Sequence, residues 1–299
     1  MPDPIISVKD FSKHFGSTEV ISDLSFEVEK GEIFAFLGPN GSGKTTTLRT
    51  LLNIYQPTTG TLLINGKRFS QAESGILGYL PEERGLYVTS KTLEMMIYFG
   101  QLKGLTTAAA KKFSLDYLKR VDLADKADVV ISKLSSGQQQ KIQLGITIIN
   151  NPQLLILDEP TKGLDPLNRE LLMDILLDLN RQGTTIIFST HQMNEAEKIA
   201  HRLLMIKDGK RALYGTVDEV KRSFGTNIIH LDYAGKFKIE PALFTAEVQP
   251  NTAEITPVKG ITASEVLQHL LTQGIEIHRF EVAAPSLDEI FIQVSKGTK

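Results

Sequence analysis

The feature that most constrains the fold is a glycine-rich loop that follows an apolar run. Ile33–Leu37 is apolar throughout, as in a strand buried on both faces of a sheet. Residues 38–45 fit the phosphate-binding pattern G-x-x-x-x-G-K-[ST], and a helix is predicted from Gly43 to about Asn53. Glycines let backbone N–H groups surround phosphate oxygens, and the helix N-terminus favours an anion. The alternative is an ordinary glycine-rich turn. The pattern predicts a nucleotide-phosphate site that comprises Gly38, Pro39, Asn40, Gly41, Ser42, Gly43, Lys44, Thr45 and Thr46.

Specific roles follow from the side chains of this loop. Lys44 would reach the β and γ phosphates, and the Thr45 hydroxyl would bind Mg²⁺. A second element supports this, because the apolar run Leu154–Leu157 ends in two carboxylates. Asp158 at the strand tip could hold the Mg²⁺ shell, and Glu159 could act as general base toward water. A solvated acidic strand end is the simpler alternative, and the phosphate-binding loop argues against it.

A third element lies between the other two along the chain. Ser135 is a good N-cap for a helix that begins near Gly137 and Gln138. A helix N-terminus with a serine and a glycine can bind an anion. Taken alone, this segment would be read as an ordinary helix cap.

Short apolar strands alternate with helical segments along most of the chain. Helices are predicted at 91–103, 107–121 and 167–182, and strands at 61–65, 154–157 and 185–188. This alternation predicts an α/β fold with a parallel sheet covered on both sides. From about residue 225, shorter β-prone and helical segments predict a small α+β domain. We expect two domains, residues 1–224 and 225–299.

Composition excludes several classes of function. A formal net charge of -2 provides no basic field for nucleic acid, so no nucleic-acid partner is expected. The chain has no cysteine, which excludes disulfides, thiolate zinc sites and a cysteine nucleophile. No signal peptide and no apolar run long enough to span a bilayer are evident, so any membrane role should come through a partner.

The order and spacing of these elements resemble the ATP-binding subunits of ABC transporters. Leu134–Gln138 resembles their LSGGQ signature, which includes Ser135, Ser136, Gly137 and Gln138. Gly163–Asp165 resembles the D-loop, His191 the switch histidine, and Phe15 the aromatic residue that stacks on adenine. The resemblance covers residues 5–224. It implies a P-loop NTPase fold with a RecA-like core, an antiparallel β subdomain and a helical subdomain at about 84–150.

The resemblance also implies a mechanism that one chain cannot complete. In the family, two Mg-ATP are held between two ATP-binding subunits, and the signature of one faces the phosphate-binding loop of the other. Ser135 and Gly137 would contact the γ-phosphate of the partner's nucleotide, and His191 would contact the γ-phosphate and orient the water. The implied cofactors are ATP and Mg²⁺. The implied partners are a second ATP-binding subunit, identical or different, and separate membrane permease subunits.

Two positions depart from the family pattern. Ser136 stands where the family usually has glycine, and serine is small enough for function to be retained. Glu82 stands where the family has a glutamine that touches Mg²⁺ or the water. A glutamate can still ligate Mg²⁺, although it cannot donate a hydrogen bond when ionised.

The C-terminal part resembles the accessory domain of bacterial sodium- and drug-efflux ATPases, with the ending Pro285–Phe291. This favours export, from a cytoplasmic position on the inner face of the membrane. The helical subdomain is expected to dock the membrane subunit, with Tyr87, Met95, Met96, Tyr98 and Phe99 either in the core or on that surface. The alternatives are a ribosome-associated ABC protein, a DNA-repair ATPase, and a regulatory ATP-binding module. The ribosome-associated proteins usually have two ATPase domains, whereas this chain has a single phosphate-binding loop. A DNA-repair ATPase would need a long coiled coil, and only about 90 residues separate Lys44 from Leu134. The presence of Glu159 and His191 argues against a regulatory module.

Overall fold

The computed structural model describes residues 4–83, 85–224, 228–258 and 260–296. The chain divides into two compact units, residues 1–215 and 216–299. The predicted boundary near 225 and the predicted start of the helical subdomain at 84 both lie outside the described residues.

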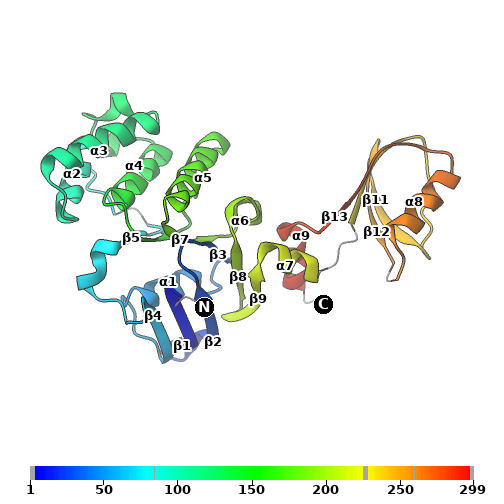
Figure 1. Ribbon diagram of the computed structural model, residues 1–299, viewed down its shortest axis with the longest axis horizontal. Helices are drawn as coiled ribbons and strands as arrows, with labels where there is room; N and C mark the ends of the chain where they lie inside the picture. The colour runs from blue at the N-terminus through cyan, green and yellow to red at the C-terminus, as the bar shows by residue number, and fades with distance from the viewer. Residues whose placement is uncertain (1–3, 84, 225–227, 259, 297–299) are drawn as a thin grey trace. The chain divides into compact units, whose positions relative to one another are not determined.

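The centre of the first unit is a six-stranded sheet in the order β5-β6-β7-β3-β8-β9 (Figure 1). The strands from β5 to β8 in this order are parallel. The apolar run predicted as a buried strand forms β3, and all five of its residues are buried, as they are in β6. The strands are β5 (Leu77–Leu80), β6 (Leu154–Asp158), β7 (Thr185–Thr190), β3 (Ile33–Leu37), β8 (Arg202–Lys207) and β9 (Lys210–Thr216).

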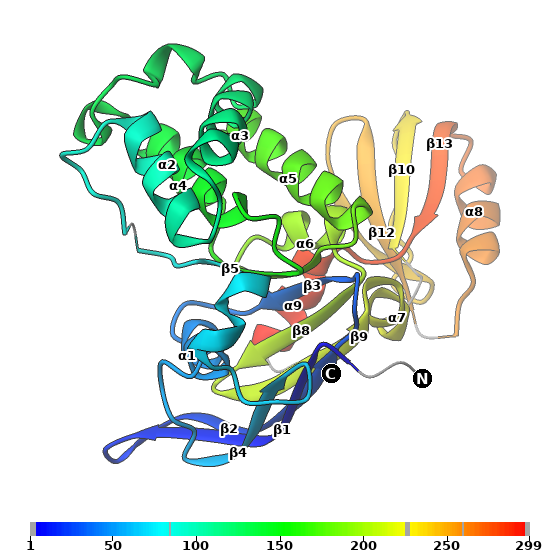
Figure 2. The ribbon, with the colours of Figure 1, turned by 60° about the vertical axis from the view of Figure 1, so that its left-hand side comes forward.

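A second sheet of the first unit is antiparallel, in the order β2-β1-β4. Its strands are β1 (Ile6–Phe15), β2 (Thr18–Val28) and β4 (Thr59–Ile64). Apolar side chains from this sheet, from the central sheet and from α1 (Lys44–Leu51) form one buried cluster. This cluster fixes the helix that follows the glycine-rich loop. Figure 2 shows α1 near the blue strands of the second sheet. The expected α/β class with an antiparallel β subdomain is confirmed.

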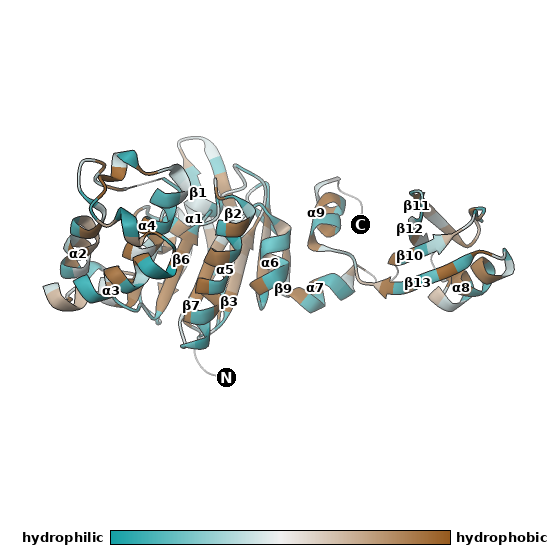
Figure 3. Cartoon of the chain, turned by 90° about the horizontal axis from the view of Figure 1, so that it is seen from above, coloured by the Kyte–Doolittle hydropathy of each residue, from teal (hydrophilic) through white to brown (hydrophobic). Residues whose placement is uncertain are grey.

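Three helices, α2 (Thr92–Leu102), α3 (Thr107–Arg120) and α4 (Ser136–Ile148), pack together as the predicted helical subdomain. All residues of α4 from Gln140 to Ile148 are buried. Helices α5 (Pro166–Arg181) and α6 (Met193–Ile199) pack on the central sheet. The residues of α5 that are buried are Leu172, Met173, Ile175, Leu176 and Leu179. Figure 3 shows brown apolar and teal polar residues interspersed along this helix. Asp165 caps α5, and Pro166 occupies its first turn, a position that proline tolerates.

The second unit contains a four-stranded antiparallel sheet in the order β11-β12-β10-β13. Its strands are β10 (Ile228–Ala234), β11 (Phe244–Val248), β12 (Thr252–Pro257) and β13 (Glu276–Ala283). Helix α8 (Ala263–Thr272) covers one face through Val266 and Leu270. The unit also contains α7 (Val217–Ser223) and α9 (Leu287–Lys296). Strands β5, β8 and β9 and helix α7 were not among the predicted elements. Within the described residues, no helix is long and apolar enough to cross a membrane.

Candidate functional site

The glycine-rich loop joins β3 to α1, and two of its glycines are required by close contacts. A Cβ at Gly38 would lie 2.3 Å from the carbonyl oxygen of Ile206, and one at Gly43 would lie 2.2 Å from Cδ1 of Ile21. Both residues also have positive φ, 149° and 105°. The loop can therefore lie against β8 and β2 only with glycine at these positions, and this leaves its N–H groups available to an anion.

Lys44 is buried at the start of α1, and its ammonium is held by the loop itself. Nζ donates to the carbonyl oxygens of Gly38 (2.7 Å) and Pro39 (3.2 Å) and lies 3.7 Å from Oε1 of Glu159. Burial lowers the Lys44 pKa, and the Glu159 and Asp158 carboxylates oppose this shift. The cation is therefore placed where an entering phosphate could replace carbonyl oxygens as its partner.

Glu159 follows β6 in a strained backbone conformation with φ of 50°. Its N–H donates to Oγ of Ser189 (3.0 Å), which holds the turn against β7. Its Oε2 is hydrogen-bonded to Nδ1 of His191 at 2.8 Å. Burial raises the Glu159 pKa, and the nearby His191 and Lys44 lower it in part. A buried carboxylate with a raised pKa and an orienting histidine has the arrangement of a general base.

Asp158 is fully buried at the end of β6. Its Oδ1 accepts a hydrogen bond from Oγ of Ser189 at 2.5 Å, whereas Oδ2 has no hydrogen-bond partner among the described residues. An unpaired buried carboxylate oxygen is costly, so a cation or ordered water is expected there. Carboxylate and hydroxyl oxygens are ligands that Mg²⁺ prefers, and Thr45 and Glu82, which line the cavity that contains Lys44, carry such oxygens. The donor set at Asp158 therefore fits Mg²⁺.

A cavity of about 430 Å³ brings many of the predicted residues together. Within the described residues, no group of three or more His, Cys, Asp or Glu side chains could hold a metal. A bound Mg²⁺ would thus keep water or phosphate oxygens as ligands. The cavity is lined by Val20, Asn40, Gly41, Gly43, Lys44, Thr45, Thr46, Glu82 and Glu159. The predicted members absent from this lining are Phe15, Gly38, Pro39, Ser42, Asp158, His191 and the signature residues 135–138.

The signature segment caps α4 at a surface-exposed site. The Ser135 hydroxyl accepts from the Gln138 N–H (3.2 Å), and the Gln138 side chain accepts from the Ser135 N–H (2.9 Å). This reciprocal capping box satisfies two donors of the helix end. A Cβ at Gly137 would lie 3.4 Å from Leu164, so the cap is close to the D-loop segment. Ser135 and Ser136 are solvent-accessible, which leaves this helix end open to another molecule.

Phe15 at the end of β1 is 44% exposed, and its ring contacts a second aromatic side chain that the sequence did not indicate. The Phe15 ring meets Tyr55 edge-on at 5.4 Å, and the Lys13 ammonium lies 4.7 Å from the ring centre. This exposed aromatic surface suits a base that stacks on a ring.

Two further polar residues near the cavity were missed by the sequence analysis. Ser189, which binds both Asp158 and the Glu159 backbone, is a polar residue directly after the apolar run of β7. Lys162 Nζ donates to Oε1 of Glu82 at 2.6 Å. Neither residue type is distinctive by itself, and only the spacing after Glu159 and before His191 could have drawn attention to them.

The aromatic and methionine residues of the helical subdomain, which the sequence left as either core or surface, fall into a buried and an exposed group. Met95 and Met96 are buried in its core, whereas Tyr87, Tyr98 and Leu102 are 55%, 47% and 63% exposed. Beside them lies a cavity of about 640 Å³. It is lined by Ser74, Gly75, Leu77, Tyr79, Phe99, Leu102, Lys103, Gly104, Ile146 and Thr147.

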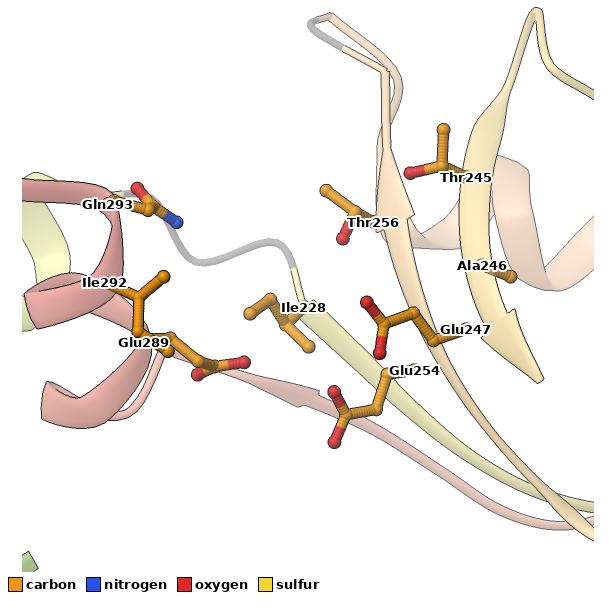
Figure 4. A pocket seen from close by; sticks show the side chains of 9 residues that line it. All are labelled: Ile228, Thr245, Ala246, Glu247, Glu254, Thr256, Glu289, Ile292 and Gln293. Atoms are coloured by element: carbon orange, nitrogen blue, oxygen red, sulfur yellow. The ribbon is translucent and has the colours of Figure 1, made fainter. Parts of the chain in front are cut away.

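The second unit has a cavity of its own, of about 400 Å³, shown in Figure 4. Three carboxylates, Glu247, Glu254 and Glu289, line it together with threonines, isoleucines and Gln293. None of its nine lining residues is Lys, Arg or His, so it has no acid–base pair comparable to Glu159 and His191. The candidate site of this chain is therefore the cavity around Lys44.

Comparisons with known proteins agree with this geometry. Residues 21–162 match the family described as ABC transporter, and residues 215–295 match the C-terminal domain of DrrA1-3-like ATP-binding proteins. An uncharacterized ABC transporter ATP-binding protein of Methanocaldococcus jannaschii is 43% identical over 73% of this chain and 80% of its own length. The Nod factor export ATP-binding protein I of Paraburkholderia xenovorans is 35% identical over 88% of this chain and 86% of its own.

A solved structure described as an ATP-binding subunit of an ABC transporter is similar to the first unit in fold. It has a TM-score of 0.69 and 29% identity, and the match covers 74% of this chain and 93% of that one. The phosphate-binding loop, the acidic strand end and the helix cap all lie within residues 21–162, which match the family. The chain belongs to the family of ATP-binding subunits of ABC transporters.

Proposed function

We propose that this chain hydrolyses Mg-ATP and thereby drives export through separate membrane subunits. The observation that carries the hydrolysis proposal is the position of Glu159, which lines the cavity together with Lys44 and is hydrogen-bonded to His191. Glu159 Oε1 lies near the Lys44 ammonium and its Oε2 is bonded to His191. A cation for the phosphates and an oriented base for water are thus supplied close together.

The residues of the cavity suggest how each step is assisted. The loop N–H groups and Lys44 would bind the β and γ phosphates, and this would release Lys44 from the Gly38 and Pro39 carbonyl oxygens. Glu159 would accept a proton from the attacking water, helped by a pKa raised through burial. Mg²⁺ held near Asp158 and Thr45 would supply charge stabilisation to the phosphates. Glu82 is a further candidate ligand, once it separates from Lys162.

The position of the signature segment, residues 134–138, supports a nucleotide site that is shared between two ATP-binding subunits. The cap at Ser135 is solvent-accessible, and no residue of 135–138 lines the cavity around Lys44. These residues therefore have no evident use for the nucleotide of their own chain. We infer that they contact the nucleotide of a second ATP-binding subunit, identical or related. Leu167, which is 82% exposed just after the D-loop segment, is a further candidate for that contact.

The membrane partner is inferred from an exposed apolar surface and from the relatives. Tyr87, Tyr98 and Leu102 leave aromatic and aliphatic area open beside a cavity, as a docking helix would require. Export is favoured because a relative named for Nod factor export spans most of the chain, and because the second unit matches a DrrA1-3-like domain. A position on the inner face of the membrane would follow from such a partner.

The test uses Glu159→Gln in the full chain. We expect turnover to fall by roughly 10²- to 10⁴-fold, the usual contribution of a general base, with ATP binding retained. With saturating Mg-ATP, light scattering after size exclusion should show a stable dimer. The double variant Glu159→Gln/Gly137→Glu is the matched control, and it should bind ATP but remain a monomer. Wild-type turnover by Glu159→Gln would remove Glu159 as the base, and a monomer at saturating ATP would exclude the homodimer.

A further inference from the structure

The switch histidine is carried by a tight turn whose geometry depends on a neighbouring hydroxyl. Thr190, the last residue of β7, is fully buried. Its Oγ1 accepts a hydrogen bond from the backbone N–H of Gln192 at 3.0 Å. The hydroxyl thus bridges the two neighbours of His191 and fixes the direction in which the imidazole leaves the strand.

A buried carboxylate holds this hydroxyl in turn. Oγ1 of Thr190 donates to Oε2 of Glu195 at 2.9 Å. Glu195 lies in α6 and is only 3% exposed. A carboxylate buried to this degree requires hydrogen bonds and a cationic partner. The bond from Thr190 satisfies one of its two oxygens.

The cationic partner comes from the first turn of α5, directly after the D-loop segment. Nε of Arg169 lies 3.4 Å from Oε1 of Glu195, and Nη2 of the same guanidinium donates to the backbone carbonyl of Leu164 at 3.4 Å. Leu164 is the middle residue of the D-loop segment Gly163–Asp165. The D-loop backbone is therefore linked to the turn that carries His191 through one ion pair, whose two atoms make no hydrogen bond among the described residues, and two flanking hydrogen bonds.

We infer that Thr190, Glu195 and Arg169 are positioning residues for His191 and couple its orientation to the D-loop. This inference rests on the proposed function of the cavity around Lys44. None of the three residues lines the cavity around Lys44. They act through His191, whose Nδ1 is bonded to Glu159. Small displacements of a positioned catalytic group cost up to about 10²-fold in rate, so even a slight relaxation of the turn should be visible in kcat.

The first test compares two changes at Thr190 with a matched control on the same strand. Thr190→Val removes the hydroxyl with little change in shape, and Thr190→Ser keeps it. Thr185→Val is the control, because Thr185 is also buried in β7 and its hydroxyl accepts from the Gly31 N–H, at 2.9 Å. We expect Thr190→Val to lower kcat by about 10- to 100-fold, with the KM for ATP within about twofold of wild type. Thr190→Ser and Thr185→Val should retain kcat within a factor of about three.

The second test asks whether Thr190 acts through His191. In a His191→Ala background, measured as single-turnover hydrolysis with excess protein, Thr190→Val should cause no further loss. Glu195→Gln keeps an acceptor for the Thr190 hydroxyl but loses the charge facing Arg169. It should lower kcat without changing ATP affinity.

Three outcomes would overturn the inference. Thr190→Val could match Thr185→Val in every parameter, its loss could persist in full in the His191→Ala background, or it could lower melting temperature and ATP affinity in parallel with kcat. The last result would mean a purely structural role. Absence of ATPase activity in the wild-type protein would instead count against the proposed function, so the two failures are distinguishable.

Discussion

Oε2 of Glu159 and Nδ1 of His191 lie 2.8 Å apart, across the carboxyl ends of two adjacent parallel strands. Parallel pairing of β6 with β7 places both residues at one edge of the sheet, although they are far apart in sequence. The other Glu159 oxygen faces Lys44. One buried carboxylate therefore connects Lys44 of the glycine-rich loop with His191.

This relationship predicts the pH dependence of hydrolysis. Burial raises the Glu159 pKa, and a general base must be deprotonated to act. The acid limb of kcat should therefore lie above the ordinary glutamate value, with kcat falling as pH drops through the raised pKa. A pH–rate profile at saturating Mg-ATP measures this limb. An acid limb at or below the pKa of an ordinary glutamate would contradict a role for the buried carboxylate.

His191→Ala should lower kcat and move the same acid limb upward. The nearby histidine lowers the Glu159 pKa, so its removal leaves burial less opposed. ATP binding by calorimetry should be retained. Substitution of His201, which also lies outside the cavity lining and whose Nδ1 accepts from the Ile33 N–H, is a matched control that should leave the limb in place.

Glu82→Gln tests the departure from the family pattern. If Glu82 acts as a surrogate for glutamine, this variant should retain or raise turnover, because an amide oxygen can still ligate and the ion pair with Lys162 is lost. Lys162→Met, which frees the carboxylate without altering it, is the paired variant. The pair is partly exposed and screened by solvent, so neither change should measurably alter the free energy of unfolding. A drop in turnover for Glu82→Gln alone would show that the carboxylate has a task of its own.

Lys44→Ala should lose most of the affinity for ATP. The ammonium is the buried cation of the cavity, and its loss leaves the phosphates with backbone donors alone. Calorimetry with ATP measures the change, and Lys30→Ala on the exposed surface is the control. Unchanged binding in Lys44→Ala would remove the phosphate-loop assignment.

Lys103 should make the free energy of unfolding depend on pH in the alkaline range. Burial lowers the Lys103 pKa to about 8, although its Nζ donates to the Thr147 carbonyl oxygen at 2.7 Å and to Asn150 Oδ1 at 3.2 Å. Between this pKa and the ordinary value of 10.5, the unfolded chain binds more protons than the folded one. Its contribution should therefore make the folded state more stable as pH rises through this window. Denaturant unfolding at several pH values should show this slope in wild type and a weaker one in Lys103→Met.

Truncation after Phe224 should leave a folded, ATP-binding fragment. The buried cluster that supports the phosphate-binding loop contains only residues up to Ile206, with Tyr214 packed against it. A shorter fragment ending at Gly215 matches the first compact unit and should behave alike if the division lies there. Cooperative thermal unfolding and ATP binding are the measurements, and an insoluble Phe224 fragment would contradict the independence of the first unit.

The sequence by itself determined the loop, the acidic strand end and the helix cap, because each depends on local chemistry. Glycines at fixed spacing, an apolar run ending in carboxylates, and a serine three residues before a glutamine are properties of short segments. The sequence also indicated the α/β class, since apolar periodicity alternates between strand and helix. Strand β8 was missed although residues 203–206 form a short apolar run like that of β6, whereas β9 mixes polar and apolar residues and carries little periodic signal.

Only the tertiary structure decided which side chains meet. The strand order placed Glu159 beside His191, set Ser189 against Asp158, and paired Glu82 with Lys162. The packing of the helical subdomain buries Met95 and Met96 and leaves Tyr87 and Tyr98 exposed, a distinction that helical spacing alone could not make. Long-range pairing depends on the register of strands that are distant in sequence, and each pairing is favoured by the burial of the whole sheet rather than by any one segment.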